Sequence, residues 1–117
     1  MQLKHRLWIE DQQHRRMMGE GVASLLRAID QTGSINQAAA RLKMSYRNAW
    51  AKIEKTEDRL GFKLVLRKTG GAEGGGTSLT PEGRLWLERF TDLQEDVAAC
   101  LDTLYCKHFP PDTEEKD

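Results

Sequence analysis

Apolar residues at helical spacing recur in three successive segments, covering residues 19–32, 34–42 and 45–60. Spacing of the i, i+3, i+4, i+7 kind places such residues on one face of a helix, so we predict three amphipathic helices. Their apolar faces can pack together into a small core. The residues on these faces are Val22, Leu25, Leu26 and Ile29 in the first segment, Ile35, Ala38, Ala39 and Leu42 in the second, and Ala49, Ile53 and Leu60 in the third.

The junction between the second and third segments is short. Ser34 and Gln37 form a capping box, in which the serine hydroxyl accepts from a backbone N–H three residues on and the glutamine reaches back. A break at residues 43–44 follows, and Ser45 is a favourable N-cap for the third helix. Two short helices joined by so tight a turn are typical of a helix-turn-helix, which we predict over residues 33–60.

Extended segments flank this unit. The period-two alternation over residues 3–9 predicts a short strand. The polar and basic stretch 11–18 is given no element. Residues 63–67 and 78–79 enclose the loop TGGAEGGGT, residues 69–77, which holds five glycines in nine positions. Two extended segments around a glycine loop predict a β-hairpin, the wing of a winged helix.

A long last helix is predicted from Thr80-Pro81-Glu82, which supplies an N-cap, a proline at the first position and an acid in the first turn. It runs to about Tyr105, and its apolar residues alternate at spacings of four and three, a coiled-coil seam. This seam comprises Trp86, Phe90, Leu93, Val97, Cys100 and Leu104. We therefore expect one domain over residues 1–108, mainly helical with a small β-hairpin wing, and a disordered acidic tail over 109–117.

The formal net charge is zero, yet the charges are segregated. Residues 41–68 hold nine Lys or Arg and three acids, a net of +6, whereas residues 82–117 hold four Lys or Arg and ten acids, a net of −6. Such a split indicates one surface for an anionic partner and another kept away from it, although ordinary solvated helix faces would also show charges.

The third helix begins with residue types that read DNA. Arg can bond guanine in a bidentate manner and Asn can do so with adenine, while a serine at a helix start can hold a phosphate. Trp50 packs at the flank of the core or against the wing, or else touches the DNA backbone. The predicted DNA-binding residues are Ser34, Ser45, Tyr46, Arg47, Asn48, Lys52, Arg67, Lys68, Gly74, Gly75 and Gly76.

Other kinds of site find no support. His5, His14 and His108 are scattered, with neither metal-ligand spacing nor a catalytic partner pattern, so we expect no enzyme, no metal and no cofactor. The glycine loop lacks the Gly-Lys-Ser/Thr ending of a nucleotide-binding loop. Cys100 and Cys106 are too few for a disulfide scaffold. Without a signal core or an apolar run long enough to span a bilayer, the protein is expected to be cytoplasmic.

Four ordered motifs resemble the DNA-binding domain of ModE-type molybdate-responsive regulators, and the first and last also resemble LysR-type regulators. They are 33–39 (GSINQAA), 44–50 (MSYRNAW), 69–76 (TGGAEGGG) and 79–83 (LTPEG). The resemblance implies a dimeric winged helix-turn-helix that binds double-stranded DNA and pairs through its N-terminal strand region and long last helix. The expected dimer contacts are Leu7, Trp86, Phe90, Leu93, Val97 and Leu104.

Full-length members of that family carry further molybdate-binding domains of β-structure. No residue of these 117 supports binding of molybdate or another oxyanion, so we expect none by this chain. Two other functions remain open: a winged-helix module that binds proteins, and a DNA-binding subunit that depends on a separate effector-sensing partner.

Overall fold

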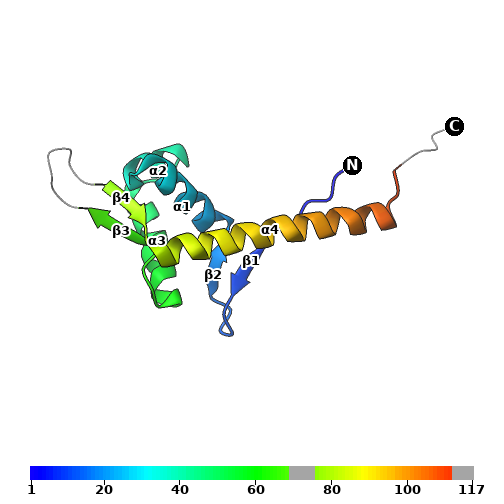
Figure 1. Ribbon diagram of the computed structural model, residues 1–117, viewed down its shortest axis with the longest axis horizontal. Coiled ribbons are helices and arrows are strands. Elements are labelled where there is room, and N and C mark those ends of the chain that lie inside the picture. The colour runs from blue at the N-terminus through cyan, green and yellow to red at the C-terminus, as the bar shows by residue number, and fades with distance from the viewer. Residues whose placement is uncertain (69–75, 112–117) are drawn as a thin grey trace.

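The computed structural model describes residues 1–68 and 76–111, and Figure 1 shows the arrangement of its elements. Within these residues lie four helices and two antiparallel two-stranded sheets, in the order β1, β2, α1, α2, α3, β3, β4, α4. None of the helices in this described part has the length and hydropathy of a membrane-spanning segment. The bounds are β1 Trp8–Glu10, β2 Arg16–Gly19, α1 Glu20–Thr32, α2 Ile35–Arg41, α3 Tyr46–Leu60, β3 Val65–Lys68, β4 Gly76–Leu79 and α4 Pro81–His108.

Helix α1 supplies the largest share of the core. Its apolar stripe is buried as the i, i+3, i+4, i+7 spacing predicts, and α2 and α3 close over it with small residues. Leu64, Leu87 and Phe90 complete the core from the hairpin side and from α4. The three predicted helices and the helix-turn-helix are therefore confirmed, each within one or two residues of its expected bounds.

The N-terminal region differs from the prediction. The strand expected over residues 3–9 is only Trp8–Glu10, and it pairs with a second strand, β2, in the stretch given no element. The carboxylate of Asp11 closes the turn between them, accepting from the backbone N–H groups of Gln13 at 2.8 Å and Arg15 at 3.0 Å. Strand β2 is hard to predict from sequence, because the only apolar residues in residues 11–18 are the two methionines at the end. Of these two, Met18 alone is fully buried.

The hairpin predicted as a wing is present. Strands β3 and β4 pair antiparallel from Val65 with Leu79 to Lys68 with Gly76. The wing tip lies outside the described residues, and with it the predicted contacts Gly74 and Gly75. The strand expected over residues 63–67 begins later, at Val65, because the preceding backbone is held by side chains from α3 and α4.

Two such side chains fix the chain just before β3. Glu57 of α3 is 6% exposed, and its Oε2 accepts from the backbone N–H of Leu64 at 2.7 Å and of Val65 at 3.3 Å. Thr80 caps α4 by accepting from the N–H of Gly83 at 2.7 Å and donates its hydroxyl to the carbonyl of Lys63 at 2.7 Å. Backbone groups just before and at the start of β3 therefore bond to a buried carboxylate and a buried hydroxyl, and not to a neighbouring strand.

Helix α4 extends beyond the other elements (Figure 1). With it, the molecule measures 68 × 33 × 23 Å. The helix reaches His108, three residues past the predicted end. The expected seam divides in two: Phe90 is 2% exposed and Trp86 packs edge-on against Phe62, whereas Leu93 and Leu104 are 41% and 43% exposed. The first half of the seam therefore belongs to the core of this chain, and Phe90 leaves almost no surface for a second copy.

Gly83 allows the first turn of α4 to approach the chain before β3. A Cβ atom on this glycine would lie 2.2 Å from the carbonyl oxygen of Leu64, a backbone atom that cannot move aside.

We predict that Gly83→Ala lowers the free energy of unfolding by about 1–3 kcal/mol, the usual cost of overpacking. Urea denaturation followed by circular dichroism measures the change. The matched control is Gly21→Ala in α1, where the new methyl would meet only the flexible end of Lys52 at 3.4 Å. The control is expected to be neutral or stabilising by up to about 1 kcal/mol. Equal effects of the two substitutions would contradict the assignment.

Candidate nucleic-acid interface

A tight turn joins α2 to α3. The backbone N–H of Met44 donates to the carbonyl of Ala39 at 2.9 Å, and Lys43 adopts a left-handed conformation with φ of 60°. Ala38, Ala39 and Ala49 are all at most 1% exposed, so the two helices meet through small side chains. This packing sets the angle between α2 and α3. The first turn of α3 remains exposed.

Serine side chains cap both helices of the unit. Ser34 Oγ accepts from the N–H of Gln37 at 3.1 Å, and Ser45 Oγ accepts from the N–H of Asn48 at 3.0 Å. The return half of the predicted capping box is replaced, because the N–H of Ser34 donates to Thr32 Oγ1 at 3.2 Å. Each serine hydroxyl keeps its own proton, which it can donate to an anion such as a phosphate.

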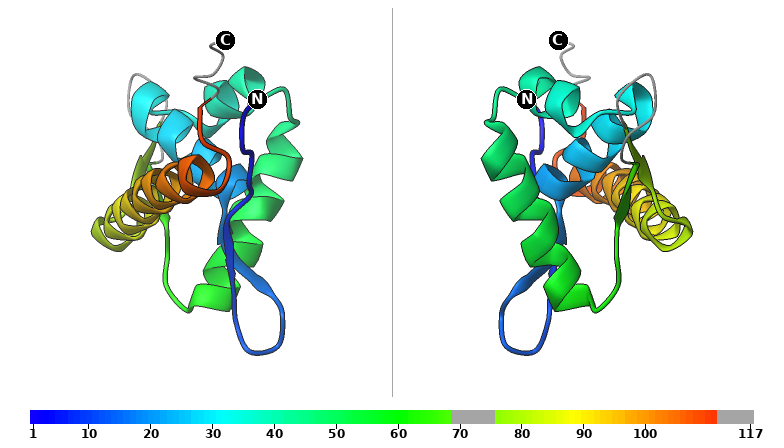
Figure 2. Two further views of the ribbon diagram at one scale, coloured as in Figure 1. Left: turned by 90° about the vertical axis from the view of Figure 1, so that its right-hand side faces the viewer. Right: turned by 90° about the vertical axis from the view of Figure 1, so that its left-hand side faces the viewer.

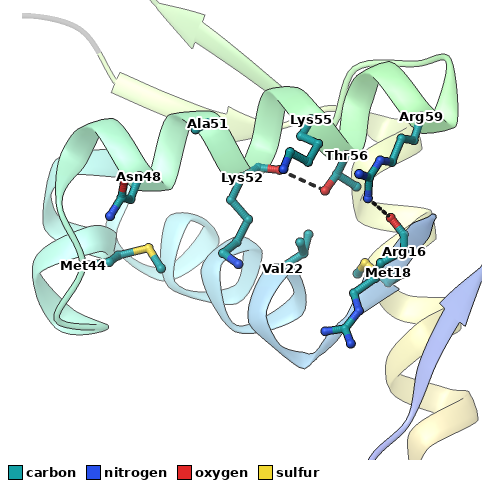
Figure 3. Close-up of a pocket in the computed structure, with 10 residues that line it drawn as sticks. All are labelled: Arg16, Met18, Val22, Met44, Asn48, Ala51, Lys52, Lys55, Thr56 and Arg59. Carbon is teal, nitrogen blue, oxygen red and sulfur yellow. Dashed lines mark hydrogen bonds between the residues drawn. The ribbon is translucent and has the colours of Figure 1, made fainter. Parts of the chain in front are cut away.

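The predicted DNA-binding residues of α3 do not all lie on the same side of the helix. Tyr46, Arg47 and Asn48 are exposed in its first turn, as expected for residues that read a partner. Lys52 departs from the predicted face, since its side chain leans over the start of α1, as Figure 3 shows, with Nζ beside Gly21. Lys52 is therefore on the flank of α3 and not among the outermost residues of its first turns.

The opposite flank of α3 is tied to the wing. The guanidinium of Arg67 in β3 lies 4.6 Å from the centroid of the Trp50 ring and donates a hydrogen bond to the hydroxyl of Tyr46. Trp50 is half-buried at the edge of the core, so of its three predicted positions the structure shows packing at the flank and against the wing. A guanidinium over an aromatic ring is a favourable contact, and it sets the position of the hairpin relative to α3.

A small polar cleft of about 220 Å³ lies where the start of α2, the start of α3 and the wing meet. The N–H of Thr77 donates to the carbonyl of Gly33 at 2.9 Å and holds β4 against the turn before α2. The cleft brings together five of the predicted residues and adds Asn36, which sequence reasoning missed although it lies in the first turn of α2. The predicted residues that line it are Ser34, Tyr46, Arg67, Lys68 and Gly76.

The groups that line this cleft suit a phosphate of a nucleic-acid backbone. Its hydroxyl, amide and guanidinium groups are donors of the kind that contact phosphates. Across residues 1–68 and 76–111, no three His, Cys, Asp or Glu side chains gather as a metal site would require. The arrangement offers hydrogen-bond donors and positive charge beside an exposed helix start.

We predict that Tyr46→Phe, which removes the hydroxyl that Arg67 contacts, loosens the wing without unfolding the core. Amide hydrogen exchange of β3 and β4 should accelerate several-fold, while exchange in α1 stays as in the wild type, because local opening follows the lost contact. The control is Tyr105→Phe, whose ring stacks on Phe109 at the far end of α4. Unchanged exchange in the hairpin would show that the hydrogen bond does not hold the wing.

The chain resembles known regulators in sequence. Residues 23–84 match the family model described as bacterial regulatory helix-turn-helix protein, lysR family. The chain is 40% identical to the molybdenum transport protein ModE of Azotobacter vinelandii over 80 residues, 68% of this chain and 30% of that protein. It is 37% identical to the transcriptional regulator ModE of Haemophilus influenzae over 89 residues, 76% of this chain and 35% of that protein. It thus spans about a third of the length of these relatives.

Solved structures show the same fold. The DNA complex of the CbnR DNA-binding domain aligns with a TM-score of 0.60 at 22% identity, covering 78% of this chain and 99% of that one. The BenM DNA-binding domain bound to benA site 1 DNA aligns with a TM-score of 0.57 at 22% identity, covering 74% and 92%. The family model covers more than half of the chain and coincides with the helix-turn-helix and wing described above. The chain therefore belongs to the LysR family of bacterial regulatory helix-turn-helix proteins, with the ModE regulators among its relatives.

Proposed function

We propose that this chain is a transcriptional regulator that binds a specific double-stranded DNA site as a homodimer, with residues 1–108 as the functional unit. The observation that carries the proposal is the exposed first turn of α3, which presents Tyr46, Arg47 and Asn48 beside the polar cleft at the wing. In helix-turn-helix proteins such a helix start enters the major groove. The wing then lies on the backbone or the adjacent minor groove.

The side chains divide into two roles. Arg47 and Asn48 are exposed and can reach base edges, where bidentate bonds to guanine or adenine carry sequence information. The cleft formed by Ser34, Tyr46 and Lys68 contacts phosphates, which fix register and orientation without reading sequence. Arg67 acts mainly as a positioning residue, because its guanidinium is already engaged with Tyr46 and Trp50.

The outer half of α4 supports dimer formation. Beyond Gln94, whose side chain bonds Arg27 and Glu20 of α1, no hydrogen bond or ion pair between side chains in the described residues ties α4 to the body. Leu93, next to Gln94, and Val97 and Leu104 beyond it lie along one seam, and Leu93 and Leu104 are exposed. A helix segment of this length is marginal in water without a partner for its apolar face, and a second copy of the same helix supplies one.

The relatives are consistent with this proposal. Two of the similar structures are complexes with DNA, and several of the relatives are named transcriptional regulators. Two recognition helices related by a twofold axis would enter successive major grooves about one helical turn apart, on a pseudo-palindromic site.

In-vitro selection from a random duplex pool tests the proposal. We expect enrichment of one pseudo-palindromic sequence, bound with an affinity that falls steeply with salt because phosphate contacts release counterions. Failure to enrich any sequence would overturn it and would favour a winged-helix module that binds proteins.

We predict that Arg47→Ala relaxes base preference at one position of the selected site and costs about 1–3 kcal/mol of binding free energy there. The companion variant Arg47→Lys keeps the charge but loses the bidentate fork, so it should relax the preference nearly as much. Binding to a panel of single-base variants measures both. An equal loss on all sequences would instead make Arg47 a phosphate contact.

We predict that Leu93→Lys or Val97→Lys produces monomers, because charge is placed in the apolar seam of α4. Sedimentation at several protein concentrations gives the mass. The control is Leu85→Lys, which alters another exposed leucine of α4 outside the seam. A dimer mass for the seam variants, or a monomer mass for the control, would contradict the assignment.

A further inference from the structure

A basic groove runs along the flank of α3 that faces away from the wing. It has a volume of about 480 Å³ and lies between α3, the start of α1 and strand β2, as Figure 3 shows. Its floor is apolar and includes Met18 and Val22. Its rim carries four cationic side chains, Arg16, Lys52, Lys55 and Arg59, which we call the groove cations.

The groove cations lack the acidic partners that three arginines elsewhere in the described residues have. Arg15, Arg27 and Arg84 each form an ion pair, with Asp11, Glu20 and Asp30 respectively. Within residues 1–68 and 76–111, none of the groove cations has a carboxylate within ion-pair distance, and no acid lines the groove. Four like charges around one groove repel each other, and an anionic partner would relieve that repulsion.

Two of the groove cations are held in place. The guanidinium of Arg59 donates to the backbone carbonyl of Arg16 at 2.9 Å, which fastens β2 to the last turns of α3. The Arg16 side chain lies over the Trp8 ring, 4.7 Å from its centroid. Met18, which is fully buried, anchors the same strand in the core. The β1–β2 hairpin therefore presents Arg16 at a fixed place, and ordering that side chain on binding costs little.

The two hairpins lie on opposite sides of α3. The wing meets α3 through Arg67, and the β1–β2 hairpin meets it through Arg59, as the bonds above require and as Figure 1 shows. Figure 2 shows the β1–β2 hairpin alongside the later turns of α3. A helix in the major groove has one phosphate backbone on each side. The wing can contact only one of them.

We propose that the basic groove binds phosphates of the DNA strand on the side of α3 opposite the wing, so that the β1–β2 hairpin acts as a second arm. This inference rests on the proposed function, since it requires α3 to lie in the major groove. The groove cations follow α3 from Lys52 to Arg59, over a helix length of about 10 Å. That length matches about three nucleotide steps along one strand, at about 3.4 Å of axial rise per nucleotide. Arg16 of the hairpin extends the row of cations.

Salt titration of binding by the full chain to its selected duplex tests this inference. Lys55→Gln is the first variant, because Lys55 is exposed and its side chain forms no hydrogen bond or ion pair in the described residues. Each lost phosphate contact should make the slope of log affinity against log salt shallower by ~0.9. With the shallower slope, the fold-loss of DNA affinity between about 50 and 200 mM salt should be roughly three-fold smaller than for the wild type. The loss should be the same on all duplex sequences.

Arg89→Gln is the matched control. It removes one positive charge from an exposed position of α4 that does not line the groove, and its slope should equal that of the wild type. Lys52→Gln is a second groove variant, which guards against a local folding defect at one position. Phosphate ethylation interference identifies the strand: positions that block the wild type on the side opposite the wing should no longer block Lys55→Gln.

The outcomes separate the two proposals. A wild type that binds a selected duplex, with wild-type slopes for both groove variants, overturns the second arm and leaves the proposed function standing. A wild type that selects no duplex overturns the proposed function itself. If the groove variants retain DNA binding but lose binding of a synthetic acidic peptide that the wild type captures, the groove is a protein-docking site and the inference is wrong.

Discussion

The close approach of α4 to the chain before β3 is the constraint on which the arrangement depends. Gly83 lets the backbone of α4 come against the carbonyl of Leu64, while Glu57 and Thr80 bond the flanking backbone groups. These contacts join the end of α3, the wing and the start of α4 at one place. Because α3 and the wing are fixed there, the polar cleft between them has one shape, and the direction of α4 is set at the same point.

Much of the fold could be predicted from the sequence, because most of its elements rest on periodicity. The stripe from Val22 to Ile29 and the caps Ser34, Ser45 and Thr80 each depend on local spacing, and each is found as expected. Strand β2 escaped prediction because its pairing depends on Asp11, whose carboxylate closes a turn that no period marks. The later start of β3 has a similar cause, since Glu57 takes hydrogen bonds from the backbone before it.

The candidate site could be predicted only in part. Residue type and position placed Arg47 and Asn48 on the exposed start of α3, because one helix supplies both. The relation of Arg67 to Tyr46 and Trp50 could not be foreseen, because it joins residues about 20 positions apart through a three-dimensional contact. The predicted spacing of apolar residues along α4 is found in the structure. Spacing alone does not say which turns of α4 are buried by the rest of the same chain, and Phe90 is one of the residues buried in this way.

Because α4 is long, a small tilt at its base produces a large displacement at its far end. With 28 residues it is about 42 Å long, so a tilt of about 5° at its base moves its far end by roughly 3.7 Å, close to the axial rise of one base pair. The network of Arg27, Glu20 and Gln94 braces its first half against α1. The stiffness of that brace, far from any base, would decide how much variation in the separation of two half-sites a pair of such chains can tolerate.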